Sequence, residues 1–388
     1  MTKRSVRIIA ALIAGALFAL AGCSGSGEGA PSDDAGAEAS EVKIGFAAPL
    51  TGDNAIYGEG MKRAVEMAIA EANESDEARA AGVTFALSAQ DDQSDPKQAV
   101  SVAKLLIGDP SVVAVVGHFN SGCTLPAAPE YAAAGLAHVT VSSNPAITAQ
   151  DFSTVNRIVA KDDAQGGYAA DLVLDELGID TVVVVDDSTQ YGQGLAAEFV
   201  KRFEAGGGTV LAAEKIQAKD VDFSAMVTKF KGLAPEAIYY GGAHTEGALL
   251  SKQAKEAGLK VPVIGGDMLF SADYMNVAGA ANAEGDICTS LGLPLEQQPR
   301  GVEFAAAYEE RYGAAPEAYD SYAYDSAWII INAVLDAGAD RDAVAQAIRA
   351  LTFDGVTGEV SFDEAGDNRN QVISSYRVEN GAWKQLID

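Results

Sequence analysis

Residues 181–185 read TVVVV and are followed by DDSTQY at residues 186–191. An unbroken run of β-branched residues of this length is typical of a strand that is buried on both faces of a parallel sheet. Residues 192–205 then follow a helical pattern, and a second short apolar run lies at residues 209–213. Strand, helix and strand in this order predict a βαβ unit, the building block of a doubly wound α/β sheet.

The same alternation extends in both directions along the chain. Further expected strands are residues 42–48, 83–89, 112–116, 138–141, 237–240 and 261–265, and further expected helices are residues 61–73, 96–106, 124–134, 165–177, 223–231 and 245–257. These units are too many for one sheet of usual size, and no linker separates them. We therefore expect an α/β fold of two doubly wound lobes joined by three hinge crossovers. We assign residues 42–160 and 291–364 to lobe 1, and residues 161–290 and 371–388 to lobe 2.

The composition excludes several classes of function. The chain has 388 residues, of which 55 are Asp or Glu and 27 are Lys or Arg, for a net charge of −28. Such an acidic surface repels polyphosphate, so we expect no nucleic-acid partner. Three cysteines are too few for a disulfide framework or a Cys-rich metal site. The histidines lack metal-ligand spacing, and we expect neither a metal nor a cofactor.

The N-terminus has the pattern of an exported protein. Residues 1–7 carry three positive charges, residues 8–20 (IIAALIAGALFAL) are apolar, and residues 20–23 read LAGC. The apolar run is too short to span a bilayer but fits a signal peptide. LAGC resembles the bacterial lipobox, in which the cysteine is lipid-modified; the alternative is an ordinary secretory peptide with a chance cysteine.

We therefore expect a lipoprotein signal peptide at residues 1–22 and lipidation of Cys23. Residues 23–41 are rich in Gly, Ser and acidic residues and predict a flexible tether. Acyl chains on Cys23 would hold the protein at a membrane surface. The expected location is extracytoplasmic, either anchored to the outer face of the cell membrane or periplasmic.

Small and polar residues follow the predicted strands. They lie at residues 49–57 (PLTGDNAIY), 117–123 (GHFNSGC), 142–145 (SSNP), 186–191 (DDSTQY), 241–246 (GGAHTE) and 265–268 (GGDM). Ligands of doubly wound sheets bind beyond the carboxyl ends of the strands, so these loops are the expected binding site.

These loops, in this order, resemble those of the extracytoplasmic branched-chain amino acid-binding proteins of ABC transporters, the leucine/isoleucine/valine-binding family with the type I periplasmic-binding fold. The resemblance covers residues 42–387, with its best pieces at residues 44–58 (IGFAAPLTGDNAIYG), 91–100 (DDQSDPKQAV), 115–126 (VVGHFNSGCTLP) and 190–194 (QYGQG). It implies a solute-binding protein and no enzyme. Such a protein captures a small amino acid-like ligand, most simply a branched-chain or other neutral amino acid, and delivers it to the transporter's permease.

The resemblance also implies roles for individual residues. Ser121 stands where the family's hydroxyl binds the ligand carboxylate, Ser143 takes a second such place, and Val141 offers a backbone carbonyl to the ammonium. Asp267 stands where the family has an acid that pairs with the ammonium. Further expected ligand-binding residues are the cleft aromatics Tyr57 and Tyr191, together with Asn120 and His244 from the same loops.

Three departures from the family pattern concern the side-chain pocket. Residues 243–244 read Ala-His where some members have an aromatic residue, and Asp267 is one methylene shorter than Glu. In members with a disulfide near the cleft, the two cysteine positions correspond to Ser94 and Asn120. A wider or more polar pocket follows, and the identity of the ligand stays open.

Two competing functions are an exported α/β hydrolase that uses Ser121 and a ligand-presenting sensor of the same fold. His118 lies three residues before Ser121, but no G-x-S-x-G motif surrounds the serine. Gly192 and Gly194 resemble part of a dinucleotide fingerprint, yet six residues separate them from the strand, which favours a role in helix packing.

Several further residues have two interpretations. Asp162, Asp163 and Gln165 fall at the first crossover, where a hinge or capping role is favoured over ligand contact. Tyr319, Tyr322 and Tyr324 open a helix over the expected cleft, and one of them is a candidate ligand contact. Cys123 and Cys288 lie on different predicted lobes, and two buried free thiols are favoured over a disulfide.

Overall fold

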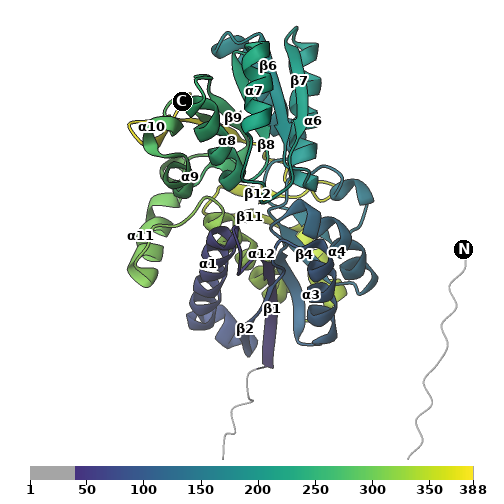
Figure 1. Cartoon of the computed structure of the whole chain (residues 1–388). Helices are drawn as coiled ribbons and strands as arrows, with labels where there is room; N and C mark the ends of the chain where they lie inside the picture. The colour runs from purple at the N-terminus through teal and green to yellow at the C-terminus, as the bar shows by residue number, and fades with distance from the viewer. Residues whose placement is uncertain (1–39, 388) are drawn as a thin grey trace, which may run out of the picture. The chain divides into compact units, whose positions relative to one another are not determined.

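Two β-sheets organise the part of the chain that the computed structural model describes, residues 40–387 (Figure 1). The expected signal peptide, the expected lipidation site Cys23 and all but the last two residues of the expected tether lie outside these described residues. Along the chain, the strands of both sheets alternate with helices, as the sequence predicts.

The first sheet has the strand order β2-β1-β3-β4-β5, and each neighbouring pair is parallel. Its central strand, with the sequence VVAVVG, is buried at every residue, as expected for a strand with helices on both faces. The strands are β1 (Ser40–Ala48), β2 (Val83–Asp91), β3 (Val112–Gly117), β4 (Ala137–Thr140) and β5 (Val155–Arg157), connected by α1 (Ala55–Glu74), α2 (Asp76–Ala81), α3 (Pro96–Gly108), α4 (Ser121–Ala133) and the 3₁₀ turn Thr148–Gln150.

The second sheet has the order β14-β13-β10-β9-β8-β6-β7, parallel from β10 to β7 and antiparallel at its β13 and β14 edge. Its strands are β6 (Thr181–Asp186), β7 (Thr209–Lys215), β8 (Ala237–Gly241), β9 (Val263–Gly265), β10 (Ile287–Leu291), β13 (Ile373–Glu379) and β14 (Ala382–Gln385). Its helices are α5 (Asp162–Asp171), which runs on into a π-helical turn (Leu172–Glu176), α6 (Gln190–Ala205), α7 (Ser224–Leu233), α8 (His244–Glu256), the 3₁₀ turn Asp267–Leu269, α9 (Ala272–Ala278) and α10 (Ala280–Ala283).

The chain passes between the sheets three times: after β5, after β10, and after the hairpin of β11 (Thr352–Asp354) and β12 (Glu359–Ser361). Between the second and third passages lie the 3₁₀ turn Leu295–Gln297, α11 (Gly301–Tyr312), α12 (Asp320–Ala337) and α13 (Arg341–Ala350). Helix α12 packs on α1, and α13 packs on β3 and β4. These features confirm the expected α/β fold. Lobe 1 below means the five-stranded sheet with its helices and α11–α13, and lobe 2 means the seven-stranded sheet with its helices.

The fold differs from the expected elements at the start of α1 and in several strands and helices that the sequence analysis did not predict. Helix α1 begins at Ala55 rather than at residue 61. A Cβ on Gly58 would lie 1.8 Å from the Pro49 carbonyl oxygen, so this glycine permits close packing inside a helix and does not mark a turn. Six strands, β5 and β10–β14, are absent from the expected elements, as are the helices α2, α9, α10, α11 and α13. Of these strands, β11–β14 pair antiparallel in short hairpins, where the sequence lacks the unbroken apolar runs of the parallel strands.

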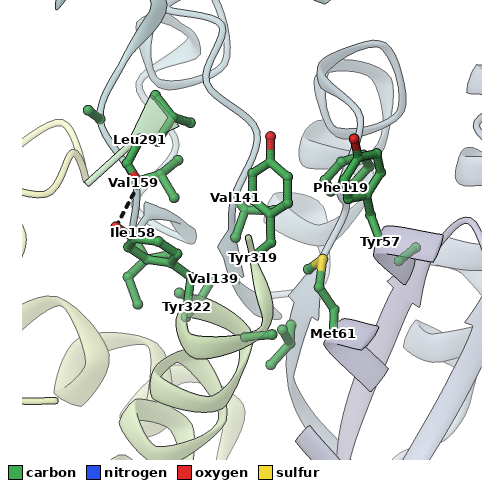
Figure 2. Packing of buried hydrophobic residues seen from close by; sticks show 14 of the residues in the cluster. Tyr57, Met61, Phe119, Val139, Val141, Ile158, Val159, Leu291, Tyr319 and Tyr322 are labelled. Carbon is green, nitrogen blue, oxygen red and sulfur yellow. Dashed lines mark hydrogen bonds between the residues drawn. The ribbon is translucent and has the colours of Figure 1, made fainter. Parts of the chain in front are cut away.

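Apolar side chains of both lobes form one continuous cluster where the lobes meet (Figure 2). Tyr319 and Tyr322, at the start of α12, pack with Val139 and Val141 of lobe 1. Across the junction the Tyr322 hydroxyl donates to the Leu291 carbonyl at the end of β10, at 2.8 Å. The start of α12 therefore joins the lobes beside the strand ends.

Two further observations concern location and redox state. No helix among residues 40–387 is both long enough and apolar enough to cross a bilayer. Cys123 and Cys288 are both buried and free, which confirms the interpretation of two separate thiols.

Candidate ligand-binding site

One cavity lies where the strand ends of the two lobes meet. Six of the eight residues expected at the ligand line it: Asn120, Ser121, Val141, Ser143, Tyr191 and Asp267; Phe119, Met268 and Tyr319 complete the lining. As folded here, the cavity leaves about 10 Å³ for the centre of a water molecule, which is room for about one water. An amino acid therefore enters only if the lobes separate or the lining side chains turn away.

The lobe 1 side of the cavity offers neutral hydrogen-bond donors. Helix α4 begins at Ser121, and its N-cap residue Asn120 makes no side-chain cap. The first N–H groups of the helix therefore lack a side-chain cap, although that of Cys123 donates to the Asn120 carbonyl at 2.9 Å, and the helix dipole adds partial positive charge at this end. Together with the hydroxyls of Ser121 and Ser143, this end of the cavity suits a carboxylate.

The lobe 2 side is acidic. Asp267, directly after β9, is 4% exposed, and its Oδ1 accepts a hydrogen bond of 2.8 Å from the Tyr191 hydroxyl. The Tyr319 hydroxyl donates to Oδ2. Burial raises the pKa of Asp267, and the two tyrosine hydrogen bonds offset part of this rise. Since both donors are neutral, a cation in the cavity would stabilise the ionised carboxylate further.

An aromatic group closes the cavity between these two ends. The rings of Tyr57 and Phe119 stack with centroids 5.2 Å apart, and Tyr319 meets Phe119 edge to face at 4.9 Å. Figure 2 shows Tyr57, Phe119, Val141 and Tyr319 gathered in this way above the core. Of these four, Phe119, Val141 and Tyr319 line the cavity, and together with Met268 they make a wall that suits an uncharged side chain.

Two of the expected residues lie behind this wall. The Tyr57 hydroxyl donates to the Met268 carbonyl at 3.1 Å and lies 3.3 Å from Nδ1 of His244. Burial lowers the pKa of His244, so its imidazole is neutral at pH 7. Tyr57 and His244 thus hold Met268 and Phe119 in place without lining the cavity.

Sequence reasoning missed Phe119 and Met268. Each is the immediate neighbour of an expected residue, Asn120 or Asp267, and that adjacency was the only signal available. Of the three candidate tyrosines, Tyr319 alone lines the cavity; the Tyr322 hydroxyl bonds to Leu291 and the Tyr324 hydroxyl to Glu71.

The geometry gives the hydrolase hypothesis no support. Both ring nitrogens of His118 are engaged, Nδ1 with Asp92 Oδ2 at 2.7 Å and Nε2 with the Tyr131 hydroxyl at 3.1 Å. The Ser121 hydroxyl accepts a hydrogen bond from the Asn144 N–H at 3.4 Å. No imidazole nitrogen of His118 is therefore free to take a proton from Ser121.

The geometry gives the dinucleotide-binding interpretation no support either. A Cβ on Gly192 would lie 2.4 Å from the Gly241 carbonyl oxygen, so this glycine lets α6 approach β8, as the packing interpretation expects. Within residues 40–387, no group of three or more His, Cys, Asp or Glu side chains is arranged to hold a metal ion.

The sequence matches the family model "Periplasmic binding protein" over residues 41–382. It is 35% identical over 345 residues to Leu/Ile/Val-binding protein homolog 1 of Brucella abortus, covering 88% of this chain and 91% of the relative. It is 35% identical over 354 residues to the leucine-, isoleucine-, valine-, threonine- and alanine-binding protein of Pseudomonas aeruginosa, covering 90% and 93%.

Solved structures give the same result. The leucine-binding protein LivK of Thermotoga maritima superposes with a TM-score of 0.81 at 28% identity, covering 89% of this chain and 98% of that one. The substrate-binding protein LivJ of Streptococcus pneumoniae, solved with isoleucine, superposes with a TM-score of 0.80 at 26% identity, covering 89% and 100%. The chain belongs to the periplasmic binding protein family of solute-binding proteins.

Proposed function

We propose that this protein binds a neutral α-amino acid between its lobes and delivers it to the permease of an ABC importer. The observation that carries the proposal is one cavity with two chemically opposite ends. Ser121, Ser143 and the start of α4 suit a carboxylate, while Asp267 suits an ammonium group. A zwitterion satisfies both ends at once, whereas a simple acid or amine leaves one of them without a partner.

The wall of the cavity favours an uncharged side chain. Phe119, Val141, Met268 and Tyr319 are apolar or aromatic and buried, and a charged group against them would lack a partner. The names of the relatives support an uncharged side chain, because they specify leucine, isoleucine, valine, threonine and alanine. These five amino acids are therefore the first ligands to test.

Closure and location complete the proposal. Ligand contacts made by both lobes exist only when the lobes are together, so the ligand favours the closed arrangement by the difference in contacts. We place the protein outside the cytoplasmic membrane, anchored there by acyl chains on Cys23, which lies outside the described residues.

Thermal unfolding of the purified protein, freed of bound ligand, tests the proposal. At a concentration 100 times the dissociation constant, a ligand that binds only the folded protein adds about 2.7 kcal/mol of stability. At least one of the five amino acids should raise the melting temperature in the wild type. Asp267→Ala and the shape-conserving Asp267→Asn should both abolish the increase, because each removes the negative charge that holds the ammonium.

The matched control is Asp273→Ala, which removes an acid six residues along the chain and outside the cavity lining. It should keep the full ligand response. If none of the five amino acids raises the melting temperature, or if only an amide or an aromatic acid does so, the amino acid proposal is wrong.

A further inference from the structure

A second hollow lies between the lobes, beside the segments that carry Asp267 and Tyr319. We call it the side groove. Lobe 1 lines it with residues 316–318 and the start of α12, lobe 2 with Phe270, the end of β10 and the β13–β14 hairpin, and the second crossover completes it. It leaves about 350 Å³ for the centre of a water molecule, against about 10 Å³ in the ligand cavity. The side groove can therefore hold a small organic molecule with the lobes as they are.

The lobe 2 wall of the side groove is aromatic. Phe270 and Trp383 are half-buried, and Tyr376 is buried. The centroid of the Phe270 ring lies 4.2 Å from that of Tyr376 and 6.1 Å from that of Trp383. The indole N–H of Trp383 donates to the Ser271 carbonyl at 3.0 Å, which fixes the ring. A wall of this kind packs against apolar groups and attracts cations to the faces of its rings.

Two acids line the same groove. Glu317 of lobe 1 is half-buried, and among residues 40–387 its carboxylate has neither a hydrogen bond nor an ion pair. Burial raises the pKa of Glu317, and the negative charge of Asp273 adds to this rise. Burial also raises the pKa of Tyr376 to about 12, and the charge of Glu296 contributes to it, so this second acid lies near the aromatic wall.

The basic residue of the groove directs its charge elsewhere. Among the described residues that line the groove, Lys384 is the only base. It pairs with Arg377 across the β13–β14 hairpin, whereas its neighbour Trp383 pairs with Val378. Successive side chains of a strand point to opposite faces, so Lys384 projects from the face opposite to Trp383. The aromatic wall and the two acids therefore face each other without a counter-ion.

This combination selects among possible occupants by charge. An anion would meet the carboxylates of Glu296 and Glu317 and be repelled. A neutral apolar molecule would cover the half-buried Glu317 and leave it without a partner. An organic ammonium ion satisfies both features of the groove, because its charge pairs with an acid while its body packs on the rings.

We propose that the side groove is a second ligand-binding site, which takes a primary ammonium ion with an aromatic or branched aliphatic body. The ammonium group pairs with Glu317, and Glu296 adds to the attraction. The body of the ligand packs against Phe270, Tyr376 and Trp383. Because the walls belong to both lobes, an occupant also favours the arrangement in which the lobes are together. The site is separate from the amino acid cavity and requires no amino acid to be bound.

Fluorescence titration of the purified Trp328→Phe variant tests the inference, because Trp383 is then the only tryptophan in the chain. The probe is 2-phenylethylammonium at low ionic strength. It should change the Trp383 emission saturably, with a dissociation constant on the order of 1 mM or lower. The neutral analogue 2-phenylethanol and the anion 3-phenylpropanoate should each bind at least about fivefold more weakly.

Calorimetric titration of variants with the same probe identifies the groups that hold it. Glu317→Gln and Trp383→Leu should each weaken binding by about three- to tenfold. Glu296→Gln should weaken it by about twofold, and this exposed residue provides a second test if Glu317→Gln fails to fold. The matched control is Glu303→Gln, which removes an exposed acid of α11 outside the groove and should keep the wild-type affinity.

Three results would overturn the inference. If 2-phenylethanol binds as tightly as the ammonium probe, or if Glu317→Gln and Glu296→Gln both keep full affinity, the groove does not recognise a cation. If Trp383→Leu keeps full affinity, the probe binds elsewhere on the protein.

A last measurement separates this site from the proposed function. Saturating 2-phenylethylammonium should tighten the binding of whichever of the five amino acids binds, and the amino acid should tighten the probe by the same factor. Independent affinities would contradict the bridging of the lobes by the occupant. If the probe binds as expected and none of the five amino acids binds, the proposed function fails while the second site stands.

Discussion

In the proposed site, recognition of the ligand's ammonium group depends on Asp267. Its two oxygens accept hydrogen bonds from Tyr191 and Tyr319, which come from different lobes. Each hydroxyl stabilises the negative charge that burial disfavours. A ligand ammonium would thus meet a carboxylate that is already oriented, and the hydrogen bond from Tyr319 also joins lobe 1 to lobe 2.

Tyr319→Phe should lower the free energy of unfolding of the ligand-free protein by about 1–3 kcal/mol, because a hydrogen bond to a buried acid is lost while the ring still packs. Tyr322→Phe is the matched control, since it removes a hydroxyl that bonds only to the neutral Leu291 carbonyl. That variant should lose about 1 kcal/mol. Urea unfolding of both variants measures the difference, and equal losses would contradict the role given to Tyr319.

At the scale of elements, the packing of α5 on α6 helps to position the cavity residue Tyr191. Helix α5 carries the buried Asp162 and Gln165, and Tyr191 is the second residue of α6. Gly166 lies in this contact: a Cβ there would be 2.8 Å from the Phe199 backbone nitrogen. The adjacent Gly167 has open space around the same position, with no atom within 4 Å. Of these two neighbouring glycines, only Gly166 is required by the packing of the helices.

Gly166→Ala should destabilise the protein by about 1–3 kcal/mol, because the added methyl forces α5 and α6 apart. Gly167→Ala should instead stabilise it by about 0.5–1 kcal/mol, because alanine loses less backbone entropy in a helix than glycine does. Chemical denaturation of the two variants gives both values. A stable Gly166→Ala variant would show that the helices adjust to the methyl group without strain.

The success of sequence reasoning also varied by element. The runs VVAVVG in β3 and TVVVVD in β6 identify central strands because burial on both faces demands apolar residues at every position. Ser121, Ser143 and Asp267 then follow as strand-end residues. The strands β13 and β14 mix polar and apolar residues, so a pattern search overlooks them. Gln165 Nε2 lies beside Gly266, the residue before Asp267, and this approach depends on how α5 packs, which no local pattern specifies.

At the scale of the whole molecule, burial has made several carboxyl groups weaker acids than they are in the unfolded chain. Burial raises the pKa of Asp162 to about 7 and that of Asp320 to about 8, and it raises Asp187 and Asp325 to about 6. The folded protein therefore binds more protons than the unfolded chain between about pH 4 and pH 8. The stability that these four buried acids contribute to the folded protein is fully present below their unfolded pKa and is lost as the pH rises through their folded pKa values.

Lowering the pH from 8 to 5 should therefore raise the melting temperature of the ligand-free protein. Asp162 and Asp320 should each contribute roughly 3 kcal/mol over this interval, and a smaller net negative charge acts in the same direction. Below about pH 4 the trend should reverse, because the hydrogen bonds from Arg157 and Lys161 help to lower the pKa of Asp367, and protonation of this acid then destabilises the fold.

Calorimetric scans from pH 3 to pH 8 measure the change of melting temperature with pH. The double variant Asp162→Asn, Asp320→Asn should flatten its neutral part, and a melting temperature that falls steadily from pH 8 to pH 5 would contradict the assignment of these acids.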